Sequence, residues 1–344
     1  MDLESQEQSS EAHTLMKQLN LHLERESKFL PKENGLNLIE AAVESENSVC
    51  SRLRDAVVED LWSLTNFFGF STKTFVRAVN LLDRFLSLMK VRPKYLSCVG
   101  IGCFHLAAKV TEEECDIPST HDIIRISQCR CSLSDLKRME KIISEKLHFE
   151  FKATTALTFL HLFYSITVCH VSESNRKDVF GFLSLDKLEA QLKACSCRLM
   201  FSKAKPSVLA LSLLILEMEA LKLIELVEVA LRVQHYSKIP DSDLLYWREL
   251  VAKCLAEYSS TECCKPDNKK LLWIVSSRTA QNLQNCTFNI PVLPTIPEGS
   301  CFEESEGEDC YEDDSLSGSP AINRGSFFPE DHSFTNGVPF VFQY

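Results

Sequence analysis

The sequence predicts an all-α protein with two tandem five-helix bundles, an N-terminal helix before them and a disordered acidic tail after them. Glycine is scarce, with ten residues in 344, against about 7% in average proteins. The long apolar patterns repeat with the period of a helix rather than that of a strand. The helical pattern of the first half also returns, weakly, in the second half, which predicts a repeated unit.

Six helices are expected in the first half, and their signals differ. In the third of them, Phe75, Val79, Leu82 and Phe85 form one apolar stripe, so this helix should be mostly buried. Pro93 suits the first turn of the next helix. The expected helices cover residues 10–28, 53–68, 73–90, 94–112, 120–127 and 133–147.

The second half echoes this order. Pro206 opens an apolar helix as Pro93 does, and residues 243–258 end the second set as residues 135–149 end the first. The expected helices cover residues 154–169, 185–200, 207–222, 223–236 and 242–258.

These patterns divide the chain into five segments. After Arg278 the helical pattern fails, and prolines at 291, 294 and 297 favour extended backbone. From Glu298 to Tyr344 eleven acidic residues face one basic residue, so this tail is predicted to be disordered. The segments are an N-terminal helix and linker (1–48), a first bundle (49–150), a second, divergent bundle (151–260), an extension (261–290) and the acidic tail (291–344).

Composition excludes several classes of protein. The fifteen cysteines contain no CxxC pair and follow no secretory signal, so reduced thiols are expected, without a metal site or any cofactor. The body has no basic stripe and no apolar run long enough to span a membrane, which argues against nucleic-acid and membrane partners. Without a clear import signal, we expect the chain in both cytoplasm and nucleus.

Catalysis is not expected. The sequence has no HExxH, GxSxG, Walker or GxGxxG pattern, and the acidic residues of the expected helices are dispersed. A cysteine nucleophile with a distant histidine stays open, because such pairs are spatial. We therefore interpret the chain as a non-enzyme.

Four motifs in the first bundle resemble the cyclin box. They are LRDAVVEDL (53–61), AVNLLDRFL (78–86), FHLAAKVTEEE (104–114) and LKRMEKIISEKL (136–147), in this order and spacing. From about residue 15 to 298 the chain is similar to the G-type cyclins. The resemblance implies cyclin-type bundles and a cyclin-dependent-type kinase as partner.

The resemblance also implies roles for single residues. Lys109 and Glu140 match the lysine and glutamate that face the kinase in activating cyclins. Val110 stands where many cyclins have an aromatic residue, which reduces the contact area offered to a kinase. Arg54 and Glu59 match a structural ion pair within one helix.

One further family feature is altered. The apolar patch that docks substrates in several cyclins corresponds to Leu53, Ala56, Val57 and Asp60, and the last is tryptophan in the family pattern. A carboxylate in an apolar groove needs a partner or water. We therefore expect weak or no binding of the usual cyclin-docking peptides.

The tail carries a candidate docking motif. Leu293, Ile296 and Glu298 stand in the order L-x-x-I-x-E, which resembles the motif read by the B-prime subunits of protein phosphatase 2A. Two apolar side chains can fill adjacent pockets while the carboxylate meets a basic one. A proline-rich linker is the alternative interpretation.

Two patterns suggest regulation. Ser300 and Ser305 each have glutamate three residues later and are candidate phosphorylation sites. Lys32, Glu33 and Asn34 spell a KEN degron, expected between the first two helices, which suggests ubiquitin-ligase machinery as a partner.

Together these signals predict an atypical, non-catalytic cyclin that binds a cyclin-dependent kinase and recruits protein phosphatase 2A, with cell-cycle progression restrained. The alternative is a conventional kinase activator whose tail serves only turnover. A helical transcription-factor-like module is a third hypothesis, which the lack of basic surface disfavours.

Overall fold

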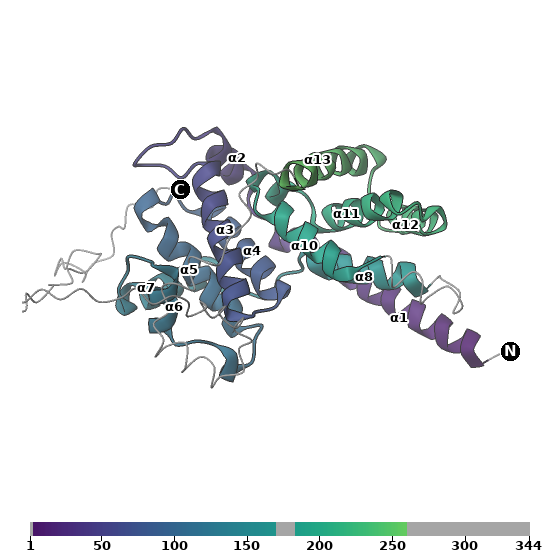
Figure 1. Ribbon diagram of the computed structural model, residues 1–344, viewed down its shortest axis with the longest axis horizontal. Coiled ribbons are helices and arrows are strands. Elements are labelled where there is room, and N and C mark those ends of the chain that lie inside the picture. Colours follow the sequence, from purple (N-terminus) through teal and green to yellow (C-terminus); the bar gives the residue numbers. More distant parts are fainter. Residues whose placement is uncertain (1–2, 170–182, 260–344) are drawn as a thin grey trace, which may run out of the picture.

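The computed structural model describes residues 3–169 and 183–259, and in these ranges all regular structure is helical. Five helices form the first bundle, at the left of Figure 1. They are α3 (Ser51–Phe68), α4 (Thr72–Leu88), α5 (Pro93–Lys109), α6 (Thr120–Ser127) and α7 (Leu133–Lys146), with a 3₁₀ turn, η2 (Glu114–Asp116), after α5. The central helix, α5, packs against α3, α4, α6 and α7.

Among the described residues, five further helices form the second bundle, at the right of Figure 1. They are α8 (Ala156–Cys169), α10 (Leu185–Ser196), α11 (Pro206–Ala220), α12 (Ile224–Tyr236) and α13 (Asp241–Ser259), with a 3₁₀ turn, η3 (Leu199–Lys203), before α11. Here α11 is central and contacts α8, α10, α12 and α13. The prediction of two five-helix bundles is confirmed.

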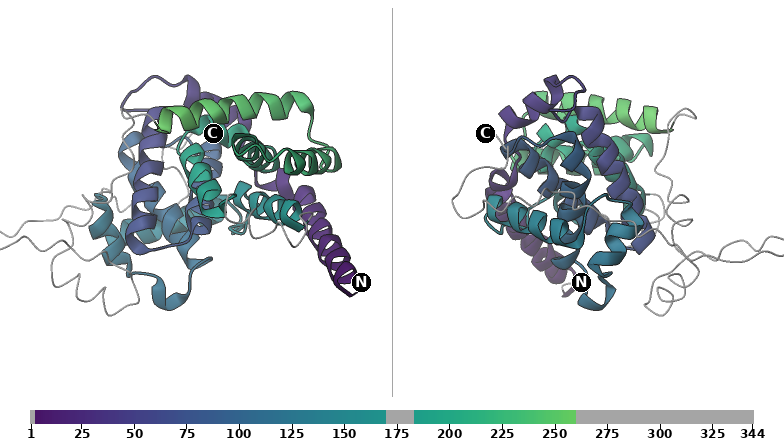
Figure 2. Two further views of the ribbon diagram at one scale, coloured as in Figure 1. Left: turned by 45° about the vertical axis from the view of Figure 1, so that its right-hand side comes forward. Right: turned by 90° about the vertical axis from the view of Figure 1, so that its left-hand side faces the viewer.

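The N-terminal segment connects the bundles. Helix α1 (Leu3–Glu26) lies along α8 of the second bundle, and its N-terminal end projects from the body in Figure 1 and in the left view of Figure 2. A short turn, η1 (Ser27–Phe29), and α2 (Glu33–Ala41) follow, and α2 packs on α4 and η3. The prediction of a linker before residue 49 is wrong at α2, because Leu36 and Ile39 are buried there.

Local signals explain where the helices begin. Ser132 and Asp135 form a complete capping box at the start of α7, and the Ser119 hydroxyl accepts from the Asp122 amide at the start of α6. Pro93 and Pro206 occupy the first turns of α5 and α11, as predicted. These caps satisfy backbone amides that have no partner within the helix.

Beyond its first turn, where Lys73 is exposed, helix α4 is buried or partly buried on every side. Its apolar stripe is in the core, as predicted, and its charged residues Arg77, Asp83 and Arg84 are also buried, each at most 7% exposed. Buried charges need partners, and Arg84 donates to the carbonyl of Glu150 in the connection between the bundles, at 2.8 Å. The charged face of α4 therefore contacts protein rather than water.

Close helix packing in the first bundle depends on glycine. A Cβ atom at Gly102 of α5 would lie 3.0 Å from Cδ1 of Ile143 and 3.5 Å from Met139 of α7. At Gly100 it would lie 2.6 Å from Cγ1 of Val57 on α3. The absence of side chains at these two positions lets α3 and α7 approach α5.

The cysteines of the described ranges are free thiols, and most of them are buried. Burial raises the pKa of Cys197 to about 12 and keeps this thiol protonated. No helix among the described residues combines the length and the apolar character that a membrane span requires.

Candidate functional site

Helices α5 and α7 bring Lys109 and Glu140 together. Lys109 is the last residue of α5, and its Nζ donates to Oε2 of Glu140, in the middle of α7, at 2.8 Å. The Lys109 side chain is 42% exposed and that of Glu140 is 12% exposed. The pair therefore reaches the surface through the lysine.

A third residue, His105, joins this pair. It lies one turn before Lys109 on α5, is 3% exposed, and its Nδ1 is 2.5 Å from Oε1 of Glu140. Burial alone would raise the pKa of Glu140, but hydrogen bonds and charges from His105 and Lys109 lower it below its usual value. Sequence reasoning missed His105 because a histidine among apolar residues of a helix is hard to tell from core.

Hydrogen bonds with α4 hold the C-terminal end of α5 in place. Val110 follows the helix as its C-cap and is half-buried. Nη1 of Arg77 approaches the Val110 carbonyl at 3.4 Å and also donates to the Thr111 hydroxyl. Glu112 in turn accepts from the amide of Ser71, the N-cap of α4, at 3.0 Å. Val110 thus lies at the surface, and hydrogen bonds between α4 and the residues that follow α5 fix the backbone around it.

Phe149 is an exposed aromatic beyond the end of α7, the helix that carries Glu140. Its side chain is 67% exposed. Phe149 has a φ of 58° and His148 before it has a φ of 53°, so two consecutive residues other than glycine adopt the left-handed region. The Phe149 amide donates to the Ser144 carbonyl at 2.8 Å, which closes the helix end. The aromatic pair in HFEF was the only sequence signal for this feature.

The expected Arg54–Glu59 ion pair is not formed. Arg54 is fully buried and instead binds Asp83 of α4, from Nε at 2.8 Å and from Nη2 at 2.6 Å. Glu59 accepts from Arg198 of the second bundle at 2.7 Å. Five positions along a helix correspond to about 140° around its axis, so Arg54 and Glu59 point in different directions.

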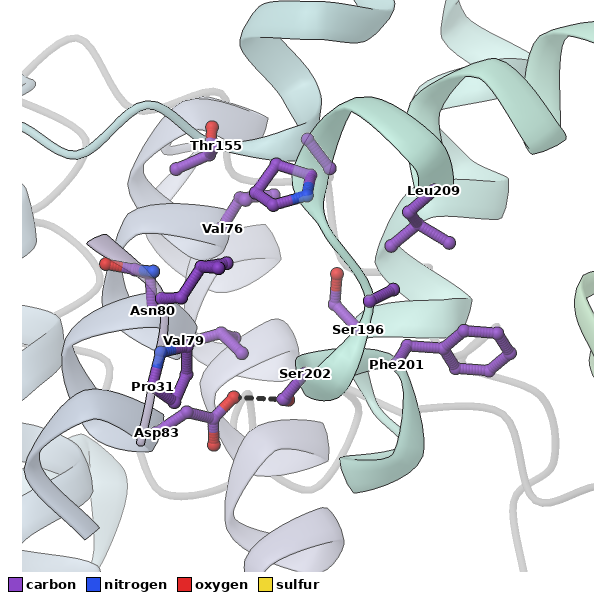
Figure 3. Close-up of a pocket in the computed structure, with 14 residues that line it drawn as sticks. Pro31, Val76, Val79, Asn80, Asp83, Thr155, Ser196, Phe201, Ser202 and Leu209 are labelled. Carbon is purple, nitrogen blue, oxygen red and sulfur yellow. Dashed lines mark hydrogen bonds between the residues drawn. The ribbon is translucent and has the colours of Figure 1, made fainter. Parts of the chain in front are cut away.

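The Arg54–Asp83 pair also contacts the second bundle. Ser202 of η3 donates to Asp83 at 2.6 Å and accepts from Arg54 at 3.1 Å. Arg54 further donates to the Ser196 carbonyl at 3.0 Å. Figure 3 shows Asp83 and Ser202 facing each other beside a cavity of about 80 Å³ that lies between α4 and the segment leading into α11.

The residues of the altered docking patch share one face of α3. Ala56 and Asp60 are exposed, and Leu53 and Val57 are partly buried. The patch thus has the small side chain of Ala56 at its centre and the carboxylate of Asp60 at one end. Its peptide-binding behaviour stays a prediction.

The other predicted residues fall in two places. Lys32 is the N-cap of α2, and Glu33 and Asn34 begin its first turn, so the KEN sequence starts a short helix that lies between α1 and α3. All three are exposed. The phosphatase motif and the two serines, Leu293, Ile296, Glu298, Ser300 and Ser305, lie outside the described residues.

Within the described part of the chain, Glu113, Cys115 and Asp116 are the one group of three potential metal ligands that lie close together. The group is at the surface, in the turn after α5. Exposed acidic groups are common without an ion.

Comparisons with known proteins agree with the fold. Residues 17–152 match the family model of the cyclin N-terminal domain. The chain is 65% identical to Homo sapiens cyclin-G2 over 315 residues, 90% of each chain, and 55% identical to Mus musculus cyclin-G1 over 293 residues, 85% of this chain and 98% of the relative. A viral cyclin from herpesvirus saimiri superposes with a TM-score of 0.53 at 15% identity, over 70% of this chain and 99% of the viral chain.

Proposed function

Since the chain belongs to the cyclin family, and within it to the G-type cyclins, we propose that it binds a cyclin-dependent-type kinase and recruits protein phosphatase 2A to it. Cyclins are regulatory and non-catalytic, and a cyclin domain implies a kinase as the kind of partner. The proposed outcome is restraint of cell-cycle progression, because a phosphatase reverses what a kinase does.

The pairing of Lys109 with Glu140 is the observation that supports the kinase part. The two residues come from different helices and meet at the surface, where the resemblance to activating cyclins implies a kinase contact. Exposed Phe149, at the end of the same helix as Glu140, adds apolar area that Val110 does not supply. Burial of a large apolar side chain stabilises a complex by about 1.5 to 3 kcal/mol.

Binding measurements with purified full-length chain test this part. Lys109→Ala and Glu140→Ala should each weaken capture of the kinase, because each removes one member of a charged contact. Lys141→Ala is the matched control, since Lys141 is on the same helix, is 76% exposed and pairs with Glu145 only at 3.9 Å. Equal capture by all three variants would exclude this surface as the kinase site.

The motif Leu293, Ile296 and Glu298 supports the phosphatase part. Pro294 and Pro297 restrict the chain before binding, which lowers the entropic cost of ordering it. The acidic residues that follow can add salt-dependent affinity for a basic surface. Phosphorylation at Ser300 or Ser305 would increase this charge.

A quantitative pull-down from cells tests the phosphatase part. The Leu293→Ala, Ile296→Ala double variant should lose the B-prime subunits and keep the kinase. Leu316→Ala, Ile322→Ala is the matched control, because it removes the same side chains elsewhere in the acidic tail. Unchanged phosphatase capture by the first variant would identify the motif as a linker.

The alternative is a conventional activating subunit, which the retained lysine and glutamate favour. It predicts that purified chain switches on a cyclin-dependent kinase and that Lys109→Ala or Glu140→Ala abolishes the activity. A chain that binds the kinase without raising its activity would exclude this alternative.

A further inference from the structure

The carboxylate of Glu140 is held by two residues of α5 that differ in mobility. Oε1 contacts the imidazole of His105, and Oε2 contacts the ammonium of Lys109. Only 3% of His105 is exposed, whereas 42% of the Lys109 side chain is exposed. Lys109 can therefore exchange Glu140 for water or a partner, and His105 cannot.

The chemistry of the contact fixes one proton. An ionised carboxylate accepts hydrogen bonds and donates none, so Nδ1 of His105 must carry the hydrogen at this contact. A neutral histidine in water prefers the other tautomer, with hydrogen on Nε2. The 2.5 Å contact with Glu140 thus selects a specific ring state.

The backbone sets the distance between the two groups. Gly102 lies one turn before His105 on α5, and the closest residues of α7 to its missing side chain are Met139 and Ile143. These two residues flank Glu140 in the sequence of α7. The close approach at Gly102 therefore places the Glu140 carboxylate beside His105 before any partner arrives.

We propose that His105 is a positioning residue that fixes Oε1 of Glu140 in the interior and so directs Oε2 to the surface, where Glu140 and Lys109 both contact the kinase. This inference rests on the proposed kinase contact. It names the residue that orients the contact, which neither the sequence motifs nor the comparisons assign.

The hydrogen bonds from His105 and from Lys109 should therefore contribute differently to the orientation of Glu140. Loss of Lys109 leaves Glu140 oriented and able to accept from a partner. Loss of His105 leaves a buried oxygen without a donor, and the carboxylate must rotate to find one. A variant at His105 should therefore weaken kinase binding even though the side chain itself is hidden from the kinase.

Two variants of the full-length chain separate positioning from packing. His105→Leu fills the space and removes the donor, and should weaken kinase binding by roughly tenfold or more. His105→Asn places an amide donor near the position of Nδ1 and should restore most of the affinity. Thermal unfolding of both variants shows whether the fold is intact. Equal affinity of His105→Leu and the unchanged chain would overturn the inference.

Nitrogen-15 NMR of the histidine rings gives a readout that does not depend on the kinase. The His105 signals, identified by their loss in His105→Asn, should show hydrogen on Nδ1, and Glu140→Ala should remove that preference. Hydrogen on Nε2 alone in the unchanged chain would overturn the inference. Hydrogen on Nδ1 in a chain that binds no kinase would support the positioning of Glu140 and refute the proposed kinase contact.

Discussion

The guanidinium of Arg54 binds the carboxylate of Asp83 at two points inside the first bundle, at 2.8 and 2.6 Å. Both residues are at most 2% exposed. Burial alone would lower the pKa of Arg54, but the charge and hydrogen bonds of Asp83 raise it above its usual value. Arg54 therefore stays charged in the folded protein.

Removing one member of this pair should be costly. Asp83→Ala leaves the Arg54 charge buried without its main partner, and the free energy of unfolding should fall by about 3 to 5 kcal/mol. Urea denaturation of the full chain measures this. Glu145→Ala, which removes the exposed partner of Lys141 at 3.9 Å, should change the free energy of unfolding by less than about 1 kcal/mol. Similar losses for both variants would contradict the role given to Asp83.

Gly35→Ala should detach α2 from α4. A Cβ atom at Gly35 would lie only 2.5 Å from Cα of Ser87, and backbone cannot move aside as a side chain can. Overpacking of this kind costs about 1 to 3 kcal/mol. Hydrogen exchange of the amides of α2 should become faster, while Asn37→Ala on the exposed face of α2 should leave it slow. Unchanged exchange in Gly35→Ala would show that α2 does not depend on this approach.

The Glu140 interactions should make stability depend on pH. The folded pKa of Glu140 lies below its ordinary value of 4.5, so its contribution to stability is fully present above that value and is lost as pH falls through the folded pKa. Unfolding free energies measured from pH 7 down to pH 3 should fall more steeply for the unchanged chain than for Glu140→Gln. Parallel curves would show that the pKa of Glu140 is the same in the folded and unfolded states.

Peptides that dock on other cyclins should bind this chain weakly or not at all. The patch on α3 offers the small Ala56 at its centre and the exposed carboxylate of Asp60 at one end. Fluorescence anisotropy with a labelled docking peptide measures the affinity, and Asp60→Trp should raise it. Tight binding by the unchanged chain, lost in Leu53→Ala, would contradict this prediction.

The sequence predicted the long helices well and missed α2. Helices such as α4 and α11 have strong apolar patterns, and serine or proline marks where they begin. The nine residues of α2 include Asn34, Gly35 and Asn37, which are poor helix formers. Its helix depends on burial of Leu36 and Ile39 against other elements, and a local pattern does not contain that information.

The site was predictable only where a motif named its residues. Lys109 and Glu140 are 31 positions apart, and their meeting was expected only from the family resemblance. The resemblance implied the nearby Glu59 as the partner of Arg54, which is wrong, because Asp83 of another helix takes that place. His105 lies within the motif FHLAAKVTEEE, but the motif assigns it no role, because that role depends on a contact across two helices.

The links between Arg54, Glu59 and the second bundle have a consequence for how the chain unfolds. Arg54 donates to Ser196, Glu59 accepts from Arg198, and α1 lies on α8, so each bundle completes the polar contacts of the other. A fragment ending near residue 150 would expose these groups and lose the surface that covers them. We therefore expect that the cyclin box of this protein is not an autonomous foldon, and that local opening of the second bundle spreads into the first.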